Sequence, residues 1–101
     1  MSRVPVIVLV PGVLRAEADG ASRVTVDAGG TLRSVFEELA ARWPRLERRV
    51  RDERGQIRRY VNVYVDGEDC RLAGGLDMPV RDGAEVQVLP SVAGGSLDRP
   101  S

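Results

Sequence analysis

The sequence predicts a two-layer α+β domain, in which one amphipathic helix covers one face of a single mixed sheet of about five strands. Several short segments alternate polar and apolar residues with the period of two that is typical of strands. One longer segment repeats its apolar residues with a helical period, and glycine or proline separates the segments. A single helix can cover only one face of one sheet, which gives two layers. With 101 residues, 43% hydrophobic and 30% charged, the chain is expected to form one folded, soluble domain.

The first two strands are expected to pair as a hairpin. Residues Val4–Val10 are almost continuously aliphatic, which indicates a strand that is buried on both faces or central in the sheet. Pro11-Gly12 ends this strand. The segment Arg23–Asp27 alternates polar and apolar residues, as a half-buried strand does.

The helix follows directly after the hairpin. Gly29-Gly30 breaks the chain, and Thr31 is placed to cap the helix N-terminus. Apolar residues then repeat at helical spacing on one face: Leu32, Val35, Phe36, Leu39 and Ala40. The helix is expected to stop near Trp43, because Pro44 disfavours helical geometry in the residue before it.

Residues 45–59 are dominated by charge. Seven arginines are mixed here with Glu47, Asp52 and Glu53, and Gly55 interrupts the run. This composition predicts an irregular or partly helical connection that is exposed to solvent. The interleaved acids favour a solvated surface over a nucleic-acid contact, and a patch for an acidic partner stays open as an alternative.

The last strands are marked by strict alternation. In Tyr60–Val65 the three valines fall on one face, with the tyrosines and Asn62 on the other. Asp66-Gly67 predicts a two-residue hairpin turn, and Glu68–Leu72 is expected to be the short return strand.

After a second turn at Asp82-Gly83, Glu85–Leu89 predicts the final strand, which Pro90 ends. Residues 91–101 have little to bury and are expected to form a flexible tail, so the domain is taken as residues 1–90. A hairpin joined to later strands through one helix is the β-grasp arrangement.

Composition excludes several classes of function. The chain has one cysteine, Cys70, and no histidine, which removes a disulfide framework, a Cys/His metal site and every dyad with a histidine base. All fifteen basic residues are arginine, which removes lysine chemistry. Cys70 is expected to be a structural, partly buried thiol. A formal net charge of zero gives no reason to expect nucleic acid as a partner, and the apolar runs are too short to span a membrane. A cytoplasmic location is therefore expected.

The C-terminal segment Leu89–Gly95 resembles the signature of the ThiS/MoaD family of ubiquitin-like sulfur carriers, which ends in a glycine pair. Two further segments are similar to the same family: Pro11–Arg15 to the loop after its first strand, and Val80–Val86 to its final turn and strand. Within the family, Tyr60–Asp69 followed by Gly74–Leu76 looks most like the carrier of a thiocarboxylate-dependent route to cysteine. The resemblance covers nearly the whole fold.

The resemblance implies that Gly94 and Gly95 are the working end of the chain. Because residues 96–101 follow, cleavage of the Gly95–Ser96 bond by a JAMM-type metalloprotease is expected to free the Gly95 carboxylate. An E1-like adenylyltransferase would then use ATP to activate this carboxylate and convert it to a thiocarboxylate. The acceptor would be an enzyme such as a pyridoxal-phosphate-dependent cysteine synthase. The carrier itself is expected to bind no cofactor and no metal and to be a protein cosubstrate, not an enzyme.

The predicted docking surface for the activating enzyme consists of residues beside this tail: Tyr64, Gln87, Leu89, Val92 and Ala93. Ordinary surface residues are the alternative interpretation of the first three. Three alternative functions stay open: a ubiquitin-like modifier conjugated through Gly95, a small subunit of molybdopterin synthase, and a structural interaction domain whose tail is never cut. A glycine pair alone is common in flexible ends, so the prediction depends on its position after the last strand.

Overall fold

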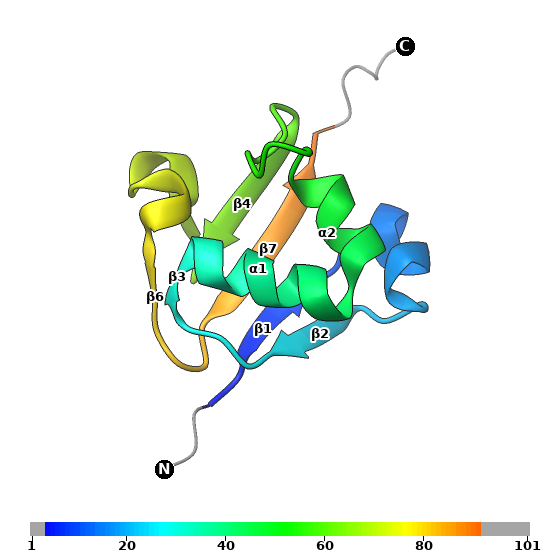
Figure 1. The fold of residues 1–101 in the computed structure, drawn as a ribbon, viewed down its shortest axis with the longest axis horizontal. Helices are drawn as coiled ribbons and strands as arrows, with labels where there is room; N and C mark the ends of the chain where they lie inside the picture. The colour runs from blue at the N-terminus through cyan, green and yellow to red at the C-terminus, as the bar shows by residue number, and fades with distance from the viewer. Residues whose placement is uncertain (1–3, 92–101) are drawn as a thin grey trace.

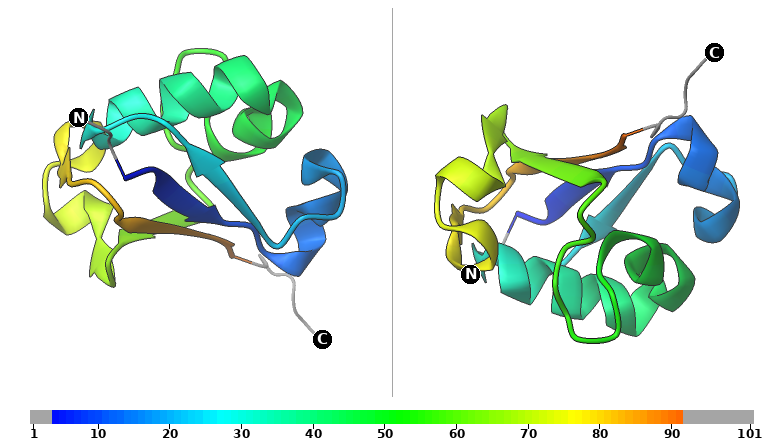
Figure 2. Two further views of the ribbon diagram at one scale, coloured as in Figure 1. Left: turned by 90° about the horizontal axis from the view of Figure 1, so that it is seen from below. Right: turned by 90° about the horizontal axis from the view of Figure 1, so that it is seen from above.

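The computed structural model describes residues 4–91 of the chain. A five-stranded mixed sheet with the order β2-β1-β7-β4-β5 forms one layer. Two helices, α1 and α2, form the second layer on one face, and the other face of the sheet is not covered by a helix (Figures 1 and 2). The predicted α+β class with a ubiquitin-like β-grasp arrangement is confirmed.

The predicted hairpin consists of β1 (Val6–Leu9) and β2 (Arg23–Val26), which pair antiparallel. Only every second residue of β1 is buried, because one face meets the core and the other faces the open side of the sheet. Burial on both faces is therefore wrong for this strand, and the interior position is confirmed, since β1 lies between β2 and β7. A 3₁₀ helix, η1 (Gly12–Ala18), connects the two strands.

The predicted helix is α1 (Leu32–Arg42), and its cap is the predicted one. Thr31 Oγ1 accepts a hydrogen bond from the backbone N–H of Ser34 at 3.2 Å. Four apolar side chains of its inner face are fully buried: Leu32, Val35, Phe36 and Leu39. The small sheet of β3 (Gly30–Thr31) and β6 (Pro79–Val80) was not predicted, since two residues are too few to show alternation.

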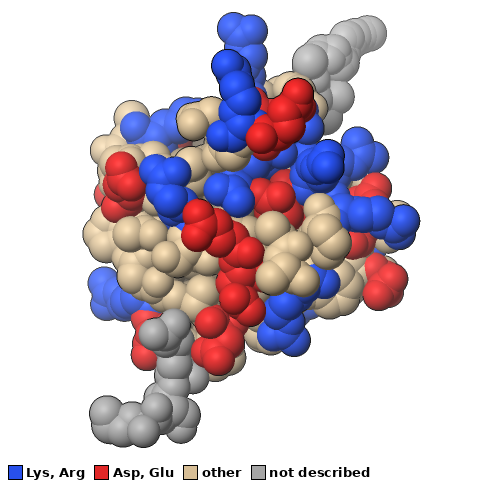
Figure 3. Space-filling model, in the orientation of Figure 1, with Lys and Arg blue, Asp and Glu red and all other residues tan. Residues whose placement is uncertain are grey.

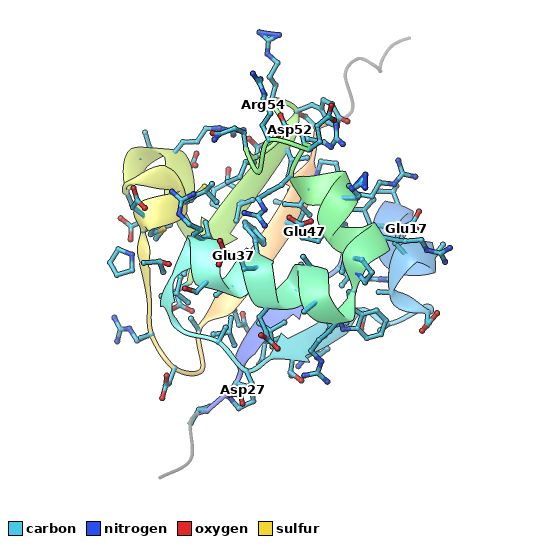
Figure 4. All side chains as sticks on the ribbon, in the orientation of Figure 1. Glu17, Asp27, Glu37, Glu47, Asp52 and Arg54 are labelled. Atoms are coloured by element: carbon cyan, nitrogen blue, oxygen red, sulfur yellow. The ribbon has the colours of Figure 1, made fainter. Side chains whose placement is uncertain are left out.

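The arginine-rich connection is more ordered than expected. Pro44 begins a second helix, α2 (Pro44–Val50), at the position where its missing N–H costs nothing. Exposure is wrong for part of this segment, because Leu46 and Val50 are buried against α1, and Glu47 and Arg51 are buried with them. Glu47 lies on the core side of α2 in Figure 4.

The β4–β5 hairpin has the predicted turn and a shorter return strand. Between β4 (Val61–Val65) and β5 (Glu68–Asp69), Asp66 and Gly67 have φ values of 50° and 86°. The chain then leaves the sheet as the 3₁₀ helix η2 (Cys70–Leu72), because Asp69 Oδ1 accepts from the N–H of Arg71 and caps this turn. The expected strand to Leu72 is therefore wrong, and Cys70 is fully buried instead of partly buried.

The middle strand of the sheet is β7 (Glu85–Pro90), which a third 3₁₀ helix, η3 (Gly75–Asp77), and β6 precede. It pairs parallel with β1 and antiparallel with β4. The described part of the chain thus ends at Ser91, directly after the central strand (Figure 1). Within residues 4–91 no helix is long and apolar enough to cross a membrane.

Candidate tail base and docking face

The C-terminal tail starts from an anchored residue at the end of β7. The backbone N–H of Ser91 and its hydroxyl both donate to the carbonyl oxygen of Tyr60, at 2.6 and 2.8 Å. The preceding pair of the register is Val61 with Pro90. The residues predicted to carry the chemistry, Gly94, Gly95 and Ser96, lie outside the described residues, as do Val92 and Ala93.

The Tyr60 carbonyl belongs to a turn, residues 58–61, that one arginine side chain holds. Arg71 donates through Nη2 to the carbonyl oxygen of Val61 at 2.7 Å and of Arg58 at 3.3 Å. The same nitrogen lies 3.4 Å from the carbonyl oxygen of Arg59, and Nη1 donates to Asn62 Oδ1 at 2.9 Å. Within the turn, the N–H of Val61 donates to the carbonyl of Arg58. The fork of a guanidinium group suits this work, because it presents several donors in a fixed plane.

Three of the five residues predicted to dock on a partner are among the described residues, and they lie together on the face of the sheet that no helix covers. Tyr64 of β4 and Gln87 of β7 are direct cross-strand partners, and Leu89 lies two residues further along β7. Leu89 is 39% exposed although it is a large apolar residue. Their predicted position opposite the buried valines is confirmed.

Leu9 adds a neighbour that sequence reasoning missed. It lies beside Gln87 in the parallel register of β1 and β7 and is half-buried on the same open face. The continuous aliphatic run around it concealed this position, since alternation was not visible there. A pocket of about 300 Å³ opens next to it, lined mainly by the ends of β1 and β7 with Arg15 and Arg23.

The opposite side of the tail base is also hollowed. Val13 and Leu14 of η1 line a second pocket, of about 250 Å³, with Arg49, Tyr60 and Pro90. Val13 is 77% exposed and Tyr60 51% exposed. The end of β7 thus lines two hollows, one with Arg15 and Arg23 in its lining and one with Arg49.

Charge is distributed unevenly along the strand direction. Near the tail base lie exposed arginines of α2 and of the loop that follows it, with Asp52 among them: Arg49, Arg54 and Arg59. Figure 3 shows arginine side chains gathered over this end of the molecule, and Arg54 projects there in Figure 4. The turns at the other end of β4 and β7 carry mainly acids: Asp66, Glu68, Asp82 and Glu85. The tail base is therefore the basic end.

The described residues offer no candidate metal site, and their one thiol is inaccessible. Between residues 4 and 91 no group of three or more potential metal-binding His, Cys, Asp or Glu side chains occurs. Cys70 lies in η2 with no exposed surface, and burial raises the pKa of its thiol while the neighbouring Arg71 opposes that shift. A thiol with a raised pKa and no access to solvent is a poor nucleophile.

A β-grasp domain whose central strand leads into a tail with a glycine pair defines the class of ubiquitin-like carrier and modifier proteins. The ThiS family model matches residues 8–95, and the chain belongs to the ThiS family. The match ends at Gly95, so residues 96–101 lie beyond it.

Curated and structural relatives agree with this assignment. The chain is 39% identical over 92 residues to the sulfur carrier protein CysO of Mycobacterium tuberculosis, covering 89% of this chain and 98% of the relative. The crystal structure of that CysO aligns with a TM-score of 0.78 at 37% identity, covering 86% of this chain and 99% of the other. CysO in the BexX/CysO complex of Amycolatopsis orientalis aligns with a TM-score of 0.80 at 36% identity, covering 89% and 99% of the two chains.

A likeness to a protein modifier is weaker. SAMP1 from Haloferax volcanii, a small archaeal modifier protein, aligns with a TM-score of 0.73 at 27% identity. The alignment covers 90% of this chain and 99% of the other.

Proposed function

We propose that this chain is a sulfur carrier, a protein cosubstrate that presents sulfur on the C-terminal carbonyl of Gly95. The observation that carries the proposal is its membership of the ThiS family over residues 8–95, together with 39% identity to sulfur carrier proteins over most of both chains. The distribution of features in the fold supports it. The tail follows the central strand of the sheet, and the described part holds no candidate metal cluster.

The chemistry requires a free carboxylate at Gly95. Residues 96–101 follow it in the sequence, so a protease of the JAMM type first hydrolyses the Gly95–Ser96 bond. An E1-like enzyme then joins the carboxylate to the α-phosphate of ATP, releasing pyrophosphate and leaving an acyl adenylate. Sulfide displaces AMP from this adenylate and gives the thiocarboxylate. Glycine suits positions 94 and 95, because a backbone without Cβ enters a narrow channel and adopts conformations that other residues resist.

The thiocarboxylate is a nucleophile for an activated acceptor. For the cysteine route, this acceptor is an activated serine on a pyridoxal-phosphate enzyme, and in a specialised pathway another electrophile takes its place. The protein acts in the cytoplasm, where ATP is available, and binds no cofactor itself.

Mass spectrometry of the intact protein tests the proposal directly. After incubation with the metalloprotease, the activating enzyme, ATP and sulfide, the mass is expected to fall by residues 96–101. The mass then rises by the difference between one sulfur and one oxygen atom, because the thiocarboxylate carries sulfur in place of one carboxylate oxygen. A Gly95→Ala variant serves as the control for the site of modification. An unchanged mass of the wild-type chain under these conditions would show the proposal to be wrong.

The open sheet face is the proposed docking surface for the activating enzyme. Tyr64, Gln87 and Leu89 form a continuous patch across β4 and β7 beside the tail base. The complex between CysO and BexX in Amycolatopsis orientalis supports a carrier that works by docking on partners.

A Leu89→Arg variant is expected to weaken binding to the activating enzyme by about tenfold, because it places a charge in an apolar contact. Leu72→Arg is the matched control. Leu72 is 85% exposed on η2, at the edge of the sheet beyond β4, so its replacement leaves affinity unchanged. Equal affinities for the two variants, measured by titration calorimetry, would remove Leu89 from the interface.

Conjugation to other proteins is the second candidate, favoured by the likeness to SAMP1. In that case the activated Gly95 carbonyl is transferred to a lysine amine of a target protein. The present chain has no lysine, so it accepts no such bond on its own side chains. Peptides carrying a Gly95 remnant on target lysines in cell extract would establish this function, and their absence alongside a detectable thiocarboxylate would exclude it.

A further inference from the structure

The hydrogen bonds at the base of the tail form a chain that runs from Arg71 to Ser91. The Arg71 guanidinium holds the carbonyls of Arg58 and Val61, which flank Tyr60 in the turn of residues 58–61. The Tyr60 carbonyl in turn accepts both hydrogen bonds of Ser91. These residues come from three separate parts of the sequence, so only the folded domain brings them together.

The geometry points to a clamp, in which Arg71, through the 58–61 turn, fixes the Tyr60 carbonyl so that Ser91 is held at the end of the central strand β7. Arg71 and Ser91 are positioning residues in this clamp, and neither touches the reacting carboxylate. The inference rests on the proposed function for its purpose and on the observed hydrogen bonds for its existence.

The clamp determines the usable length of the tail. Only residues 92–95 separate Ser91 from the Gly95 carbonyl, and four residues span at most about 14 Å when fully extended. If Ser91 is released, the next point of attachment is the pairing of Asn62 with Leu89, because Val61 and Pro90 form a non-hydrogen-bonded pair of the antiparallel ladder. Release of the clamp therefore lengthens the reach by about two residues, or roughly 7 Å.

A fixed reach selects partners. An activating enzyme whose reactive centre lies at the bottom of a channel requires the carbonyl of Gly95 to arrive at one depth, and a misplacement of about 1 Å costs up to a hundredfold in rate. The length of the tail beyond the clamp is thus a specificity determinant for the partner enzymes, separate from the docking patch on the open face.

The existence of the clamp in solution is tested without any partner. In the wild-type chain, the amide of Ser91 is expected to exchange with solvent at least tenfold more slowly than in an unstructured peptide. Arg71→Ala should bring the exchange rate close to the peptide value. Arg59→Ala is the matched control, since Arg59 is an exposed arginine of the same turn, and it should leave the rate unchanged. Fast exchange of Ser91 in the wild type would overturn the clamp.

The role in reach is tested by combining a shortened tail with a released clamp. Deletion of Val92 is expected to lower kcat/KM for adenylation of Gly95 by about tenfold or more, because the carbonyl stops short of the reactive centre. In a Ser91→Pro background, which removes both donors of Ser91, the same deletion should cost less than about threefold, because the freed segment restores the reach. Ser91→Ala keeps the N–H bond and is the control.

The outcomes distinguish a failure of the clamp from a failure of the proposed function. If Ser91 has only a structural role, the losses in kcat/KM from Ser91→Pro and from the deletion of Val92 multiply, and that result overturns the assignment of reach to the clamp. If the wild-type chain is not adenylated by any candidate enzyme, the proposed function fails, and the exchange rate of Ser91 still decides whether the clamp exists.

Discussion

Glu47 and Arg51 form a buried ion pair one helical turn apart at the end of α2. Their side chains are 11% and 10% exposed, and the Arg51 guanidinium carbon lies 5.7 Å from the centre of the Phe36 ring of α1. A buried pair of this kind is costly to break from one side, because the remaining charge has no compensation. The pair therefore fastens α2 and the following loop onto α1.

Replacement of Glu47 by alanine is expected to lower the free energy of unfolding by about 3 kcal/mol, because it leaves Arg51 buried without its partner. Glu17→Ala is the matched control, since Glu17 pairs with the more exposed Arg45 and Arg49 and its loss should cost less than about 1 kcal/mol. Urea unfolding at pH 7 measures both. Equal losses would mean that the Glu47–Arg51 pair has no special role.

The thiol of Cys70 gives the stability a pH dependence at the alkaline side. Burial raises its pKa in the folded state above the ordinary 9.0, so the unfolded chain loses this proton first as the pH rises. The stabilisation that the protonated Cys70 thiol gives to the folded state is complete below pH 9.0 and is lost as the pH rises through the folded-state pKa.

Wild-type stability is therefore expected to fall more steeply above pH 9.0 than that of a Cys70→Ala variant. The difference between the two urea-unfolding curves isolates the thiol from the titration of other groups. Parallel pH profiles would contradict the assignment. Alkylation of Cys70 by iodoacetamide in the folded protein should also require partial unfolding, as the side chain is fully buried.

At the level of elements, prediction from the sequence succeeded where the pattern is local. Helix α1 repeats four buried apolar residues and has its own cap, and β4 alternates over five residues, so each element was predicted close to its bounds. Helix α2 offers only Leu46 and Val50 as apolar residues among charges, and its burial depends on α1. Elements of two residues, such as β3 and β6, exist only through their partner and carry no signal of their own.

The β4–β5 turn shows a local pattern tied to a distant strand. Asp66 and Gly67 both adopt positive φ, as an Asp-Gly turn predicts. Asp66 also exchanges hydrogen bonds with Glu85 at the start of β7. Its N–H donates to the Glu85 carbonyl at 2.8 Å, and its Oδ1 accepts from the Glu85 N–H at 3.0 Å. The turn thus fixes the start of the strand from which the tail emerges.

Gly67→Ala is expected to destabilise the domain by about 1 to 2 kcal/mol, because a Cβ is strained in the left-handed conformation that Gly67 adopts. Gly12→Ala is the control. Gly12 has no positive φ, and a Cβ there meets nothing within 4 Å, so its replacement should change stability by less than about 0.5 kcal/mol. Thermal unfolding of the two variants distinguishes strain from loss of glycine in general.

Across the whole molecule, a net charge of zero conceals a separation of charge along the strands. Arginines predominate near the tail base, and acids predominate at the turns at the other end of β4 and β7. Such a field orients the molecule during encounter with a partner and acts on the association rate more than on the dissociation rate. A partner with an acidic channel entrance would receive the tail end first.

Arg54→Glu is expected to slow association with the activating enzyme by about threefold to tenfold and to reduce its dependence on salt. The matched control is Arg81→Glu, an exposed arginine at the acidic end, which should change the rate by less than about twofold. Stopped-flow measurements between low and physiological ionic strength provide the test. Equal effects of both variants would show that the position of the charge has no influence.

Only part of the candidate site could be predicted from the sequence. The segment Leu89–Gly95 and the alternation of β4 and β7 identified the tail and the open face. The contacts that hold the tail base join Arg71 to Val61 across 10 positions of the chain and Ser91 to Tyr60 across 31, and no local pattern marks them. Tertiary hydrogen bonds of this kind follow from the packing of the fold and become visible only with it.

The central place of β7 has a mechanical consequence. A partner that pulls on the tail applies force along β7, whose five pairs with β4 and three with β1 stand across the direction of pull. Force in this direction loads the hydrogen bonds on both sides of the strand together, whereas an edge strand can be peeled away one bond at a time. A partner can therefore pull the tail into a narrow channel without unfolding the domain outside.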